Sequence, residues 1–414
     1  MARSLLIRNA AQLVTAASAE GAPVRGRDMA RLTIVSDAAV AVADGVIRWV
    51  GSSAGVPAAF LEGAELVDAV GKVVLPGLVD SHTHLVWAGS RVEEFEQRLL
   101  GRSYQEIAAA GGGINASVAQ VRAASKETLK DLTRRRLLRL LRFGVTTVEI
   151  KTGYGLNLAD EMKCLEVIAE LNAEGPWELV PTFLGAHAVP PEYRHDRTAY
   201  VDLLLNEILP AVARSGLAEF CDVFCEAGVF SLEETERILG RAREVGLAAK
   251  VHADELTPLG GAELAARLGA TSADHLLCIT DAGIDALASG TTVATLLPGT
   301  ALFLGVAYAP ARRLIDRGLP VALASDCNPG TCPSENLPLA GALACTQMKM
   351  LPAEVVTALT LNAACALGRG RRLGTLEVGK QADLVLCDVS DYRQIFYHFG
   401  VNHVWRVYKR GRLV

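Results

Sequence analysis

The sequence predicts an α/β protein, a (β/α)8 TIM barrel with a small β-sandwich domain formed by the N- and C-terminal segments. Three observations support this fold class. Short apolar runs alternate with amphipathic helical stretches between residues 69 and 371, and eight such runs can be counted. Residues 1–68 and 372–414 are instead rich in strand patterns. Half of the 414 residues are hydrophobic, enough to fill the core of a barrel of about 250 residues.

The two terminal segments are predicted to form one composite domain. The stretch LTIVSDAAVAVADGVIRWVG contains two apolar runs joined by Asp44-Gly45, which is a strong hairpin signal. The C-terminal stretches GTLEVGKQADLVLCDV and HVWRVYKRGRLV have the same character. Neither segment is long enough to enclose a core alone. We therefore expect 1–68 and 372–414 to pair into one sandwich that brings the termini close together.

The middle segment, 69–371, is predicted to form the catalytic barrel. Near-continuous apolar runs are typical of strands that are buried on both faces. Amphipathic helices separate them, such as the one that ends in RRRLLRLLRF with Gly144 as its stop. The eight candidate strands are LVDSHTHL (78–85), VTTVEIK (145–151), ELVPTFLGAH (178–187), CDVFCE (221–226), AAKVHADE (248–255), SADHL (272–276), TTVATLLPG (291–299) and PVALASD (320–326).

Composition favours a cytoplasmic protein with no nucleic-acid or membrane partner. The net charge of -5 argues against binding nucleic acid. The uncharged stretch 286–311 is interrupted by Pro298 and Gly299, which favours a barrel strand and a loop over a membrane span. Nine cysteines without framework spacing, and a start without a secretory leader, favour a reducing compartment. The sequence does not fix the oligomeric state, and a homodimer is compatible with it.

Five of the eight histidines fall at the ends of predicted strands, where the active sites of such barrels lie. His82 and His84 end the first strand. Residues two apart on a strand point to the same side, so both imidazoles should face the mouth of the barrel. Neutral imidazole is a common metal ligand, and the cluster therefore predicts a metal site. The other three are His187, His252 and His275, on strands three, five and six.

Together with Asp326 at the end of the eighth strand, this pattern resembles the amidohydrolase superfamily. The predicted sandwich, which is built from both ends of the chain, and the tail GTLEVGKQADLVLCD also resemble this superfamily. The resemblance implies that one divalent metal ion is bound by three histidines and one aspartate. Such a set suits Zn²⁺ or Fe²⁺. The implied ligands are His82, His84, His252 and Asp326.

Many members of this superfamily hold two metals bridged by a modified lysine on the fourth strand. Here the fourth strand reads CDVFCEAG and carries no lysine, while Lys151 lies at the end of the second strand. We therefore expect one metal per chain. Glu226, at the end of the fourth strand, is a rival ligand that we expect to be structural.

Four longer blocks resemble the imidazolonepropionase family, and the resemblance spans essentially the whole chain. It implies that a metal-activated water opens the ring of 4-imidazolone-5-propanoate to give N-formimidoyl-L-glutamate, a step of histidine degradation. A bound divalent metal lowers the pKa of water from about 16 to about 7. The blocks are HTHLVWAGSRVEEFEQRLLGRSYQEIAAAGGGI, VEIKTGYGLNLADEMK, TFLGAHAVPPEY and ASDCNPGTCP.

Catalytic and substrate-binding residues follow from the same resemblance and from chemistry. Glu255, three residues after a ligand, can pass a proton from water to the leaving nitrogen, and His275 can stabilise the developing oxyanion. Arg91 is expected to bind the propionate, because a guanidinium fork suits a carboxylate. The chain departs from the family at Cys327, where a bulkier apolar residue is expected. The other implied substrate-binding residues are Tyr154, His187, Asn328, Gly330 and Thr331.

Two other functions remain open at this point. A deaminase of purines, pyrimidines or triazines would use the same metal-binding set, but a neutral base needs no clamp such as Arg91. A non-catalytic metal-binding scaffold would need the ligands but neither Glu255 nor His275. A surface pair of Arg91 with Glu93 or Glu94 is the alternative interpretation of the arginine.

Overall fold

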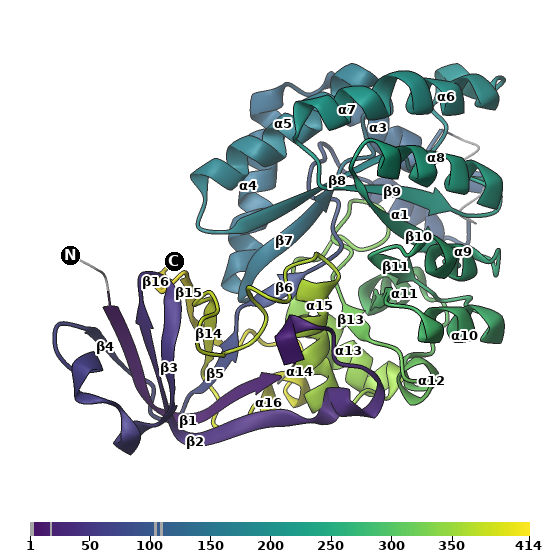
Figure 1. The fold of residues 1–414 in the computed structure, drawn as a ribbon. Coiled ribbons are helices and arrows are strands. Elements are labelled where there is room, and N and C mark those ends of the chain that lie inside the picture. The colour runs from purple at the N-terminus through teal and green to yellow at the C-terminus, as the bar shows by residue number, and fades with distance from the viewer. Residues whose placement is uncertain (1–3, 17–18, 103–105, 108–110) are drawn as a thin grey trace.

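The computed structural model describes residues 4–16, 19–102, 106–107 and 111–414. These residues form a parallel barrel sheet of eight strands, surrounded by helices, and a separate sheet of eight strands (Figure 1). The predicted fold class is therefore confirmed. Residues 103–105 and 108–110, which belong to the first of the four sequence blocks above, lie outside the described residues.

Each predicted apolar run overlaps one barrel strand, but the eighth strand ends at Leu323, so Asp326 follows this strand instead of ending it. The first strand is shorter than predicted. It ends at Asp80, so His82 and His84 follow the strand instead of ending it, because their main chain bonds to the segment after the eighth strand. The barrel strands are β6 (Leu78–Asp80), β7 (Val145–Lys151), β8 (Glu178–Ala186), β9 (Phe220–Cys225), β10 (Ala248–Ala253), β11 (Ser272–His275), β12 (Val293–Leu296) and β13 (Val321–Leu323).

The seam of the barrel lies between β6 and β13, and it is closed beyond the ends of these strands. The amide of Asp326 donates to the carbonyl of His82 at 3.0 Å, and the amide of His84 donates to the carbonyl of Cys327 at 3.0 Å. The barrel therefore closes at the level of three predicted metal ligands.

Helices cover the outside of the barrel. The longest, α4 and α5, begin at residues whose side chains accept a backbone N–H, Ser125 and Asn157. The α4 helix ends just before Gly144, whose φ of 86° suits glycine, as predicted. The α-helices are α1 (Val92–Leu99), α3 (Ile114–Ala123), α4 (Lys126–Arg142), α5 (Leu158–Glu174), α6 (Arg197–Leu203), α7 (Leu209–Ser215), α8 (Leu232–Glu244), α9 (Gly261–Leu268), α10 (Asp281–Ser289), α11 (Pro298–Leu304), α12 (Ala311–Asp316), α13 (Leu337–Met348), α14 (Pro352–Leu359), α15 (Leu361–Cys365) and α16 (Gln394–Tyr397).

The uncharged stretch 286–311 contains the end of α10, then β12 and α11. The predicted barrel strand is confirmed, but the predicted loop after it is wrong, because Pro298 and Gly299 begin helix α11, where a proline in the first turn needs no backbone N–H. In the described part of the chain, no helix has both the length and the apolar character that crossing a membrane requires.

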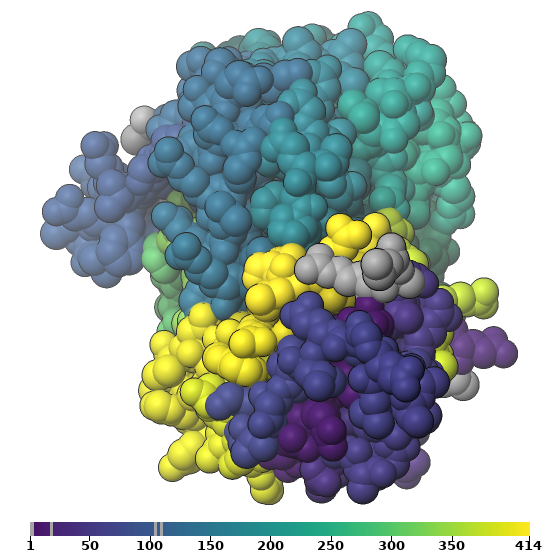
Figure 2. All heavy atoms as spheres, turned by 90° about the vertical axis from the view of Figure 1, so that its left-hand side faces the viewer, coloured from purple at the N-terminus to yellow at the C-terminus, as the bar shows by residue number. Residues whose placement is uncertain are grey.

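The second sheet joins the two ends of the chain. Its order is β16-β15-β14-β5-β1-β2-β3, with β4 also paired to β1. Figure 2 shows the two terminal segments, purple and yellow, packed together below the barrel. The strands are β1 (Ser4–Ala16), β2 (Leu32–Ala43), β3 (Val46–Ser52), β4 (Glu65–Asp68), β5 (Val73–Pro76), β14 (Leu384–Cys387), β15 (Val404–Lys409) and β16 (Arg412–Leu413).

Strand β5 lies inside the range expected for the barrel but belongs to this terminal sheet. It pairs with β1 on one side and with β14 on the other, and the barrel begins two residues later at Leu78. The sheet also curls round on itself, because the amide of Ile47 in β3 donates to the carbonyl of Lys380 just before β14. Apolar side chains from both halves, including Ile47 and Leu384, share one core.

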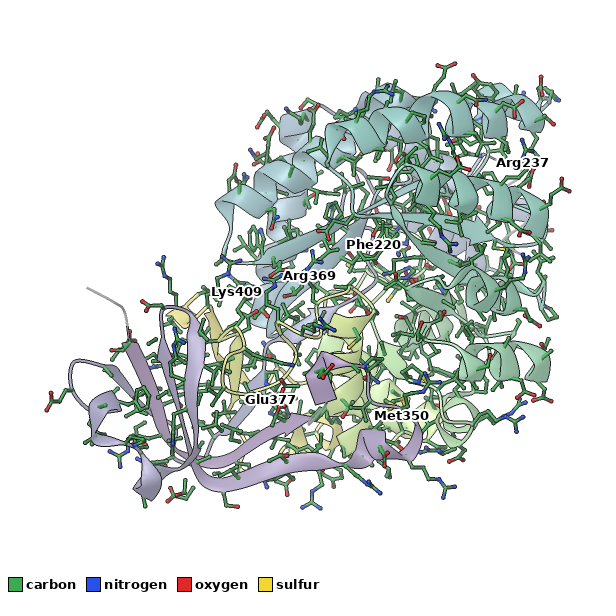
Figure 3. The ribbon with its side chains drawn as sticks, viewed as in Figure 1. Phe220, Arg237, Met350, Arg369, Glu377 and Lys409 are labelled. Carbon is green, nitrogen blue, oxygen red and sulfur yellow. The ribbon has the colours of Figure 1, made fainter. Side chains whose placement is uncertain are left out.

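Charged side chains join the terminal sheet to the bottom of the barrel. Lys409 of β15 pairs with Asp383 at 2.7 Å and lies 3.8 Å from Glu178 of β8. Arg369 donates to the same Glu178 at 3.1 Å, and Arg372 also pairs with it. Figure 3 shows Lys409 and Arg369 at this boundary.

Candidate active site

Four buried side chains converge at the top of the barrel near the seam. One ring nitrogen from each of His82, His84 and His252 lies within 4.8 Å of the others. The Nε2 atoms of His82 and His84 lie 3.5 and 3.6 Å from Oδ1 of Asp326. Ligands held about 2.1 Å from a tetrahedral metal are separated by roughly 3.4 Å. The spacing of these donors therefore fits one metal ion.

The hydrogen bonding of these histidines supports the same conclusion. The Nε2 atoms of His82 and His252 are buried and have no hydrogen-bond partner. Buried polar atoms in proteins are nearly always bonded. Burial holds the pKa of His82 and His84 well below the ordinary range, so both rings are neutral and keep a lone pair. The donor set thus fits a divalent metal such as Zn²⁺ or Fe²⁺.

Two carboxylates lie next to the Nδ1 atoms of two of these histidines. Oδ2 of Asp274 lies 2.7 Å from Nδ1 of His82, and Oδ2 of Asp222 lies 3.0 Å from Nδ1 of His252. Burial alone would lower the pKa of His252, but the charge of Asp222 outweighs it and raises that pKa. Carboxylates in this position orient imidazole ligands and leave Nε2 toward the metal. Both belong to the buried strands β9 and β11.

Backbone conformation also directs two of the side chains. His275 has φ 78° and Asp326 has φ 55°, in the left-handed region that non-glycine residues rarely adopt. Such residues cost of order 1–3 kcal/mol each and cluster at functional sites. Both side chains line the cavity described in the next paragraph.

We call the four converging residues, His82, His84, His252 and Asp326, the ligand cluster. A cavity of about 440 Å³ opens over this cluster at the mouth of the barrel. Its lining combines metal ligands with almost all of the residues expected to act on the substrate. Gly330 is the exception, because it does not line the cavity. The predicted residues that do are His84, Arg91, Tyr154, His187, His252, Glu255, His275, Asp326, Asn328 and Thr331.

Glu255 reaches the cavity from the loop after β10. Its Oε2 lies 3.6 Å from Nε2 of His275, and burial, together with the nearby charge of Asp326, raises its pKa to about 8. Glu226, the rival metal ligand of the sequence analysis, instead bonds to the loop after β10. Its Oε2 accepts hydrogen bonds from the amides of Leu256 and Thr257, so it holds the loop that carries Glu255.

Arg91 pairs with a glutamate and also lines the cavity. Its Nε and Nη2 donate to Oε2 of Glu94 at 2.9 and 2.7 Å. The partner is one of those named in the alternative interpretation, but the pair is buried, with side chains only 5% and 13% exposed. A Cβ at position 330 would come within 2.0 Å of Nη1 of Arg91, so Gly330 leaves room for the guanidinium.

Asn328 shapes the loop beyond the last ligand. Its Oδ1 accepts from the amides of Gly330 and Thr331 at 2.8 Å, and its Nδ2 donates to the carbonyl of Asp326 at 2.7 Å. These bonds order the loop that carries two predicted pocket residues. Cys327, between Asp326 and Asn328, is fully buried.

Two rings stand beside the ligand cluster. The His187 ring stacks on His84 with 5.1 Å between centres, and its Nδ1 lies 3.0 Å from the carbonyl of Gly153. Burial lowers the pKa of His187 to about 3, so the ring is neutral. The Tyr154 ring centre lies 5.3 Å from that of His187.

Comparison with known proteins decides the family. The model of the amidohydrolase family matches residues 73–414. Curated imidazolonepropionases from Geobacillus kaustophilus and Porphyromonas gingivalis are 51% and 50% identical to the chain. These matches cover 100% and 99% of this chain, and 98% and 97% of the relatives. The chain belongs to the imidazolonepropionase family of amidohydrolases.

Solved structures with the same fold include proteins of much lower sequence identity. Guanine deaminase from E. coli superposes with a TM-score of 0.74 at 15% identity, over 99% of this chain and 98% of the other. Zinc-bound atrazine chlorohydrolase TrzN from Arthrobacter aurescens TC1 gives 0.68 at 17% identity, over 99% and 94%. At these identities the likeness concerns the fold.

The sequence did not reveal that several charged side chains are buried beside the predicted metal ligands. Asp222 and Asp274 received no role, and Lys151 was considered only as a bridging ligand. The available signal was a charge inside an otherwise apolar strand, as in VEIK and CDVFC. Such a charge is costly to bury unless it is paired, so it indicates a neighbour that the sequence alone does not name.

Proposed function

We propose that this member of the imidazolonepropionase family hydrolyses 4-imidazolone-5-propanoate to N-formimidoyl-L-glutamate. The observation that carries the proposal is the cavity in which Glu255, Arg91 and the ligand cluster face the same space. A deaminase would need the ligands and Glu255 but no arginine. Full-length identity of 51% to a curated imidazolonepropionase supports the same choice.

In this proposal one divalent metal, Zn²⁺ or Fe²⁺, is held by the four converging residues. When bound, it supplies Lewis acidity that lowers the pKa of water and stabilises charge on a carbonyl oxygen. The strand β9 carries no lysine that could bridge a second ion. The proposed ligands are His82, His84, His252 and Asp326.

Glu255 is proposed as the proton carrier. It takes a proton from the water that attacks the ring carbonyl carbon, and it gives the proton to the ring nitrogen as the C–N bond breaks. The carbonyl carbon becomes the new carboxylate of the product. Burial of Glu255 favours its protonated form, which suits a group that must hold a proton between two transfers. His275, beside it, stabilises the charge that develops on the carbonyl oxygen.

The substrate's propionate is proposed to bind Arg91. The guanidinium is fixed by Glu94 on one side and admitted by Gly330 on the other, so it is already oriented before the substrate arrives. A charge-assisted bond to a carboxylate then costs little further ordering. Around it, Tyr154, His187, Asn328 and Thr331 complete the proposed pocket. Gly330 is proposed to contribute from beside Arg91, where it leaves room for the guanidinium.

A substrate panel with metal analysis on the same sample tests the proposal. The panel contains 4-imidazolone-5-propanoate, an imidazolone without the propionate, and aminated purines, pyrimidines and triazines. We expect ring opening of the first compound at a kcat/KM at least about tenfold above the others. Equal activity on the imidazolone without propionate, or release of ammonia from an aminated base, would favour the deaminase. Bound metal without turnover of any compound would favour the scaffold.

A further inference from the structure

A layer of charged side chains lies inside the barrel, directly beneath the ligand cluster. All five are fully buried, and they come from β7 and from the three neighbouring strands β9, β10 and β11, with β8 between β7 and β9. Burying ions is costly unless each is paired, so three carboxylates and two ammonium groups here depend on one another. This ionic layer consists of Glu149 and Lys151 of β7, Asp222 of β9, Lys250 of β10 and Asp274 of β11.

One ammonium of the ionic layer stands between the two carboxylates that contact metal ligands. Nζ of Lys151 lies 2.7 Å from Oδ2 of Asp222 and 3.5 Å from Oδ2 of Asp274. The same two oxygens lie 3.0 Å from Nδ1 of His252 and 2.7 Å from Nδ1 of His82. A single side chain is therefore linked to two of the four proposed ligands through one intervening carboxylate each.

The second ammonium is placed differently. Nζ of Lys250 lies 2.8 Å from Oε1 of Glu149 and 3.0 Å from the carbonyl of Ser81. In the part of the chain that the structure describes, no hydrogen bond or ion pair joins Lys250 to Asp222 or Asp274. Lys151 also binds Glu149, at 2.9 Å. The two lysines thus share residue type, burial and one partner. Burial raises the pKa of Asp274, and the charge of each lysine acts to lower it. They differ in contact, because Lys151 pairs with both aspartates and Lys250, among the described residues, with neither.

The geometry explains why this contact matters for metal binding. A carboxylate that accepts the Nδ1 proton leaves the Nε2 lone pair of the imidazole toward the metal and fixes the ring plane. Without the ammonium, the charges of Asp222 and Asp274 would repel each other across the vacated space. Both carboxylates would then turn away from the rings that they orient.

We propose that Lys151 is a positioning residue of the metal centre. By holding Asp222 and Asp274 in place, it orients His252 and His82 and so strengthens metal binding, although it contacts neither the metal nor the substrate. This inference rests on the proposed function, because it assumes a metal at the ligand cluster.

The test is the Zn²⁺ affinity of metal-free protein, measured by competition with a chromophoric chelator. The variants are Lys151→Met and, as the matched control, Lys250→Met. Loss of a group that orients a ligand typically weakens metal binding 10–100-fold. We expect that loss for Lys151→Met and a change of less than about threefold for Lys250→Met. In Co²⁺-loaded protein, the ligand-field absorption bands should shift for Lys151→Met and match the parent for Lys250→Met.

Three results would overturn the inference. They are parent-like affinity in Lys151→Met, an equal loss in both variants, and unchanged Co²⁺ bands in Lys151→Met. A parent protein that binds no Zn²⁺ would instead contradict the proposed function. The outcomes of the two proposals are therefore distinguishable.

If Lys151→Met does not fold, a charge-balanced pair replaces it. Lys151→Met with Glu149→Gln removes one positive and one negative group, so the net charge of the ionic layer is unchanged. Circular dichroism and melting of the metal-free forms verify the fold. Compared with Glu149→Gln alone, the double variant should still bind Zn²⁺ about 10–100-fold more weakly. Equal affinity in these two proteins would overturn the inference.

Discussion

The backbone amide of Asp326 donates a hydrogen bond of 3.0 Å to the carbonyl oxygen of His82, so two proposed metal ligands are joined through the main chain across the barrel seam. The neighbouring bond from His84 to Cys327 repeats the arrangement. Ligand positions therefore depend on the closure of the barrel. A metal ion bound to both sides would in turn tie β6 to β13.

Metal removal should abolish activity and lower the melting temperature. We expect elemental analysis to find one divalent metal per chain. A ligand that binds only the folded state stabilises it by about 4 kcal/mol at a thousand times its Kd. His252→Ala should lose the metal, while His195→Ala, an exposed histidine on another loop, should keep it. Two metals at full occupancy would contradict the prediction.

Glu255→Gln should keep the metal and the fold but lose turnover. The amide preserves the shape of the side chain and cannot accept the proton. General acid–base groups contribute on the order of 10²–10⁴-fold to rate, and we expect kcat to fall within that range. Metal content and melting temperature should equal those of the parent and of Glu233→Gln, an exposed glutamate on α8. A kcat within about threefold of the parent would show that Glu255 has another role.

Arg91→Ala should raise KM for imidazolone propionate by about ten- to a hundredfold, with a smaller effect on kcat. The propionate is remote from the bond that breaks, so its contact is present in both ground and transition states. Such charge-assisted bonds contribute roughly 1.5–3 kcal/mol. Arg91→Lys should restore only part of the lost affinity for the substrate, because an ammonium group lacks the forked, planar geometry of the guanidinium.

The buried pair with Glu94 supplies a control for that prediction. Glu94→Gln leaves the guanidinium in the cavity but removes its charged neighbour, so KM should change less than in Arg91→Ala. If the arginine served only this pair, the two substitutions would lower stability to a similar extent and leave KM nearly unchanged. Steady-state kinetics and thermal melting of both variants distinguish these outcomes.

Acid should weaken the contact between the terminal sheet and the barrel. Burial alone would raise the pKa of Glu178, but Arg372, Lys409 and Arg369 outweigh it and lower that pKa below the ordinary value of 4.5. A carboxylate whose pKa is lower in the folded state stabilises the fold above its unfolded pKa. This stabilisation is lost as pH falls below about 4.5. The parent should therefore melt above Glu178→Gln near neutral pH, and the gap should narrow below about pH 4.5. A gap that is constant with pH would contradict this account.

Much of the fold could be predicted because apolar runs carry its strongest signal. The residues of β7 are the predicted ones, and most other barrel strands differ only at their ends. The end of β6 could not be predicted from the local sequence. After Asp80, the main chain of His82 and His84 forms hydrogen bonds with Asp326 and Cys327, which lie more than 200 residues away in the sequence. Strand β5 shows the same limit, since its partners β1 and β14 come from the two ends of the chain.

The candidate site was predictable in its residue types and less so in its contacts. Strand-end histidines and Asp326 were identified, and the structure brings them together. The partners of Lys151 were not, because alternation along β7 says which face a side chain occupies and not which carboxylates of β9 and β11 meet it there. The pairing of Arg91 with Glu94 was named as an alternative, but its burial depends on packing around Gly330.

The position of β5 between β1 and β14 has a consequence for the order in which the protein can be completed during synthesis. The ribosome releases β1 and β5 early, whereas β14 follows more than 300 residues later. Until then, one edge of β5 has no strand to pair with, and unpaired edges of this kind invite association with other chains. A nascent or truncated chain that ends before Leu384 would expose that edge, so the last thirty or so residues protect the first strands from aggregation as well as finishing the sheet.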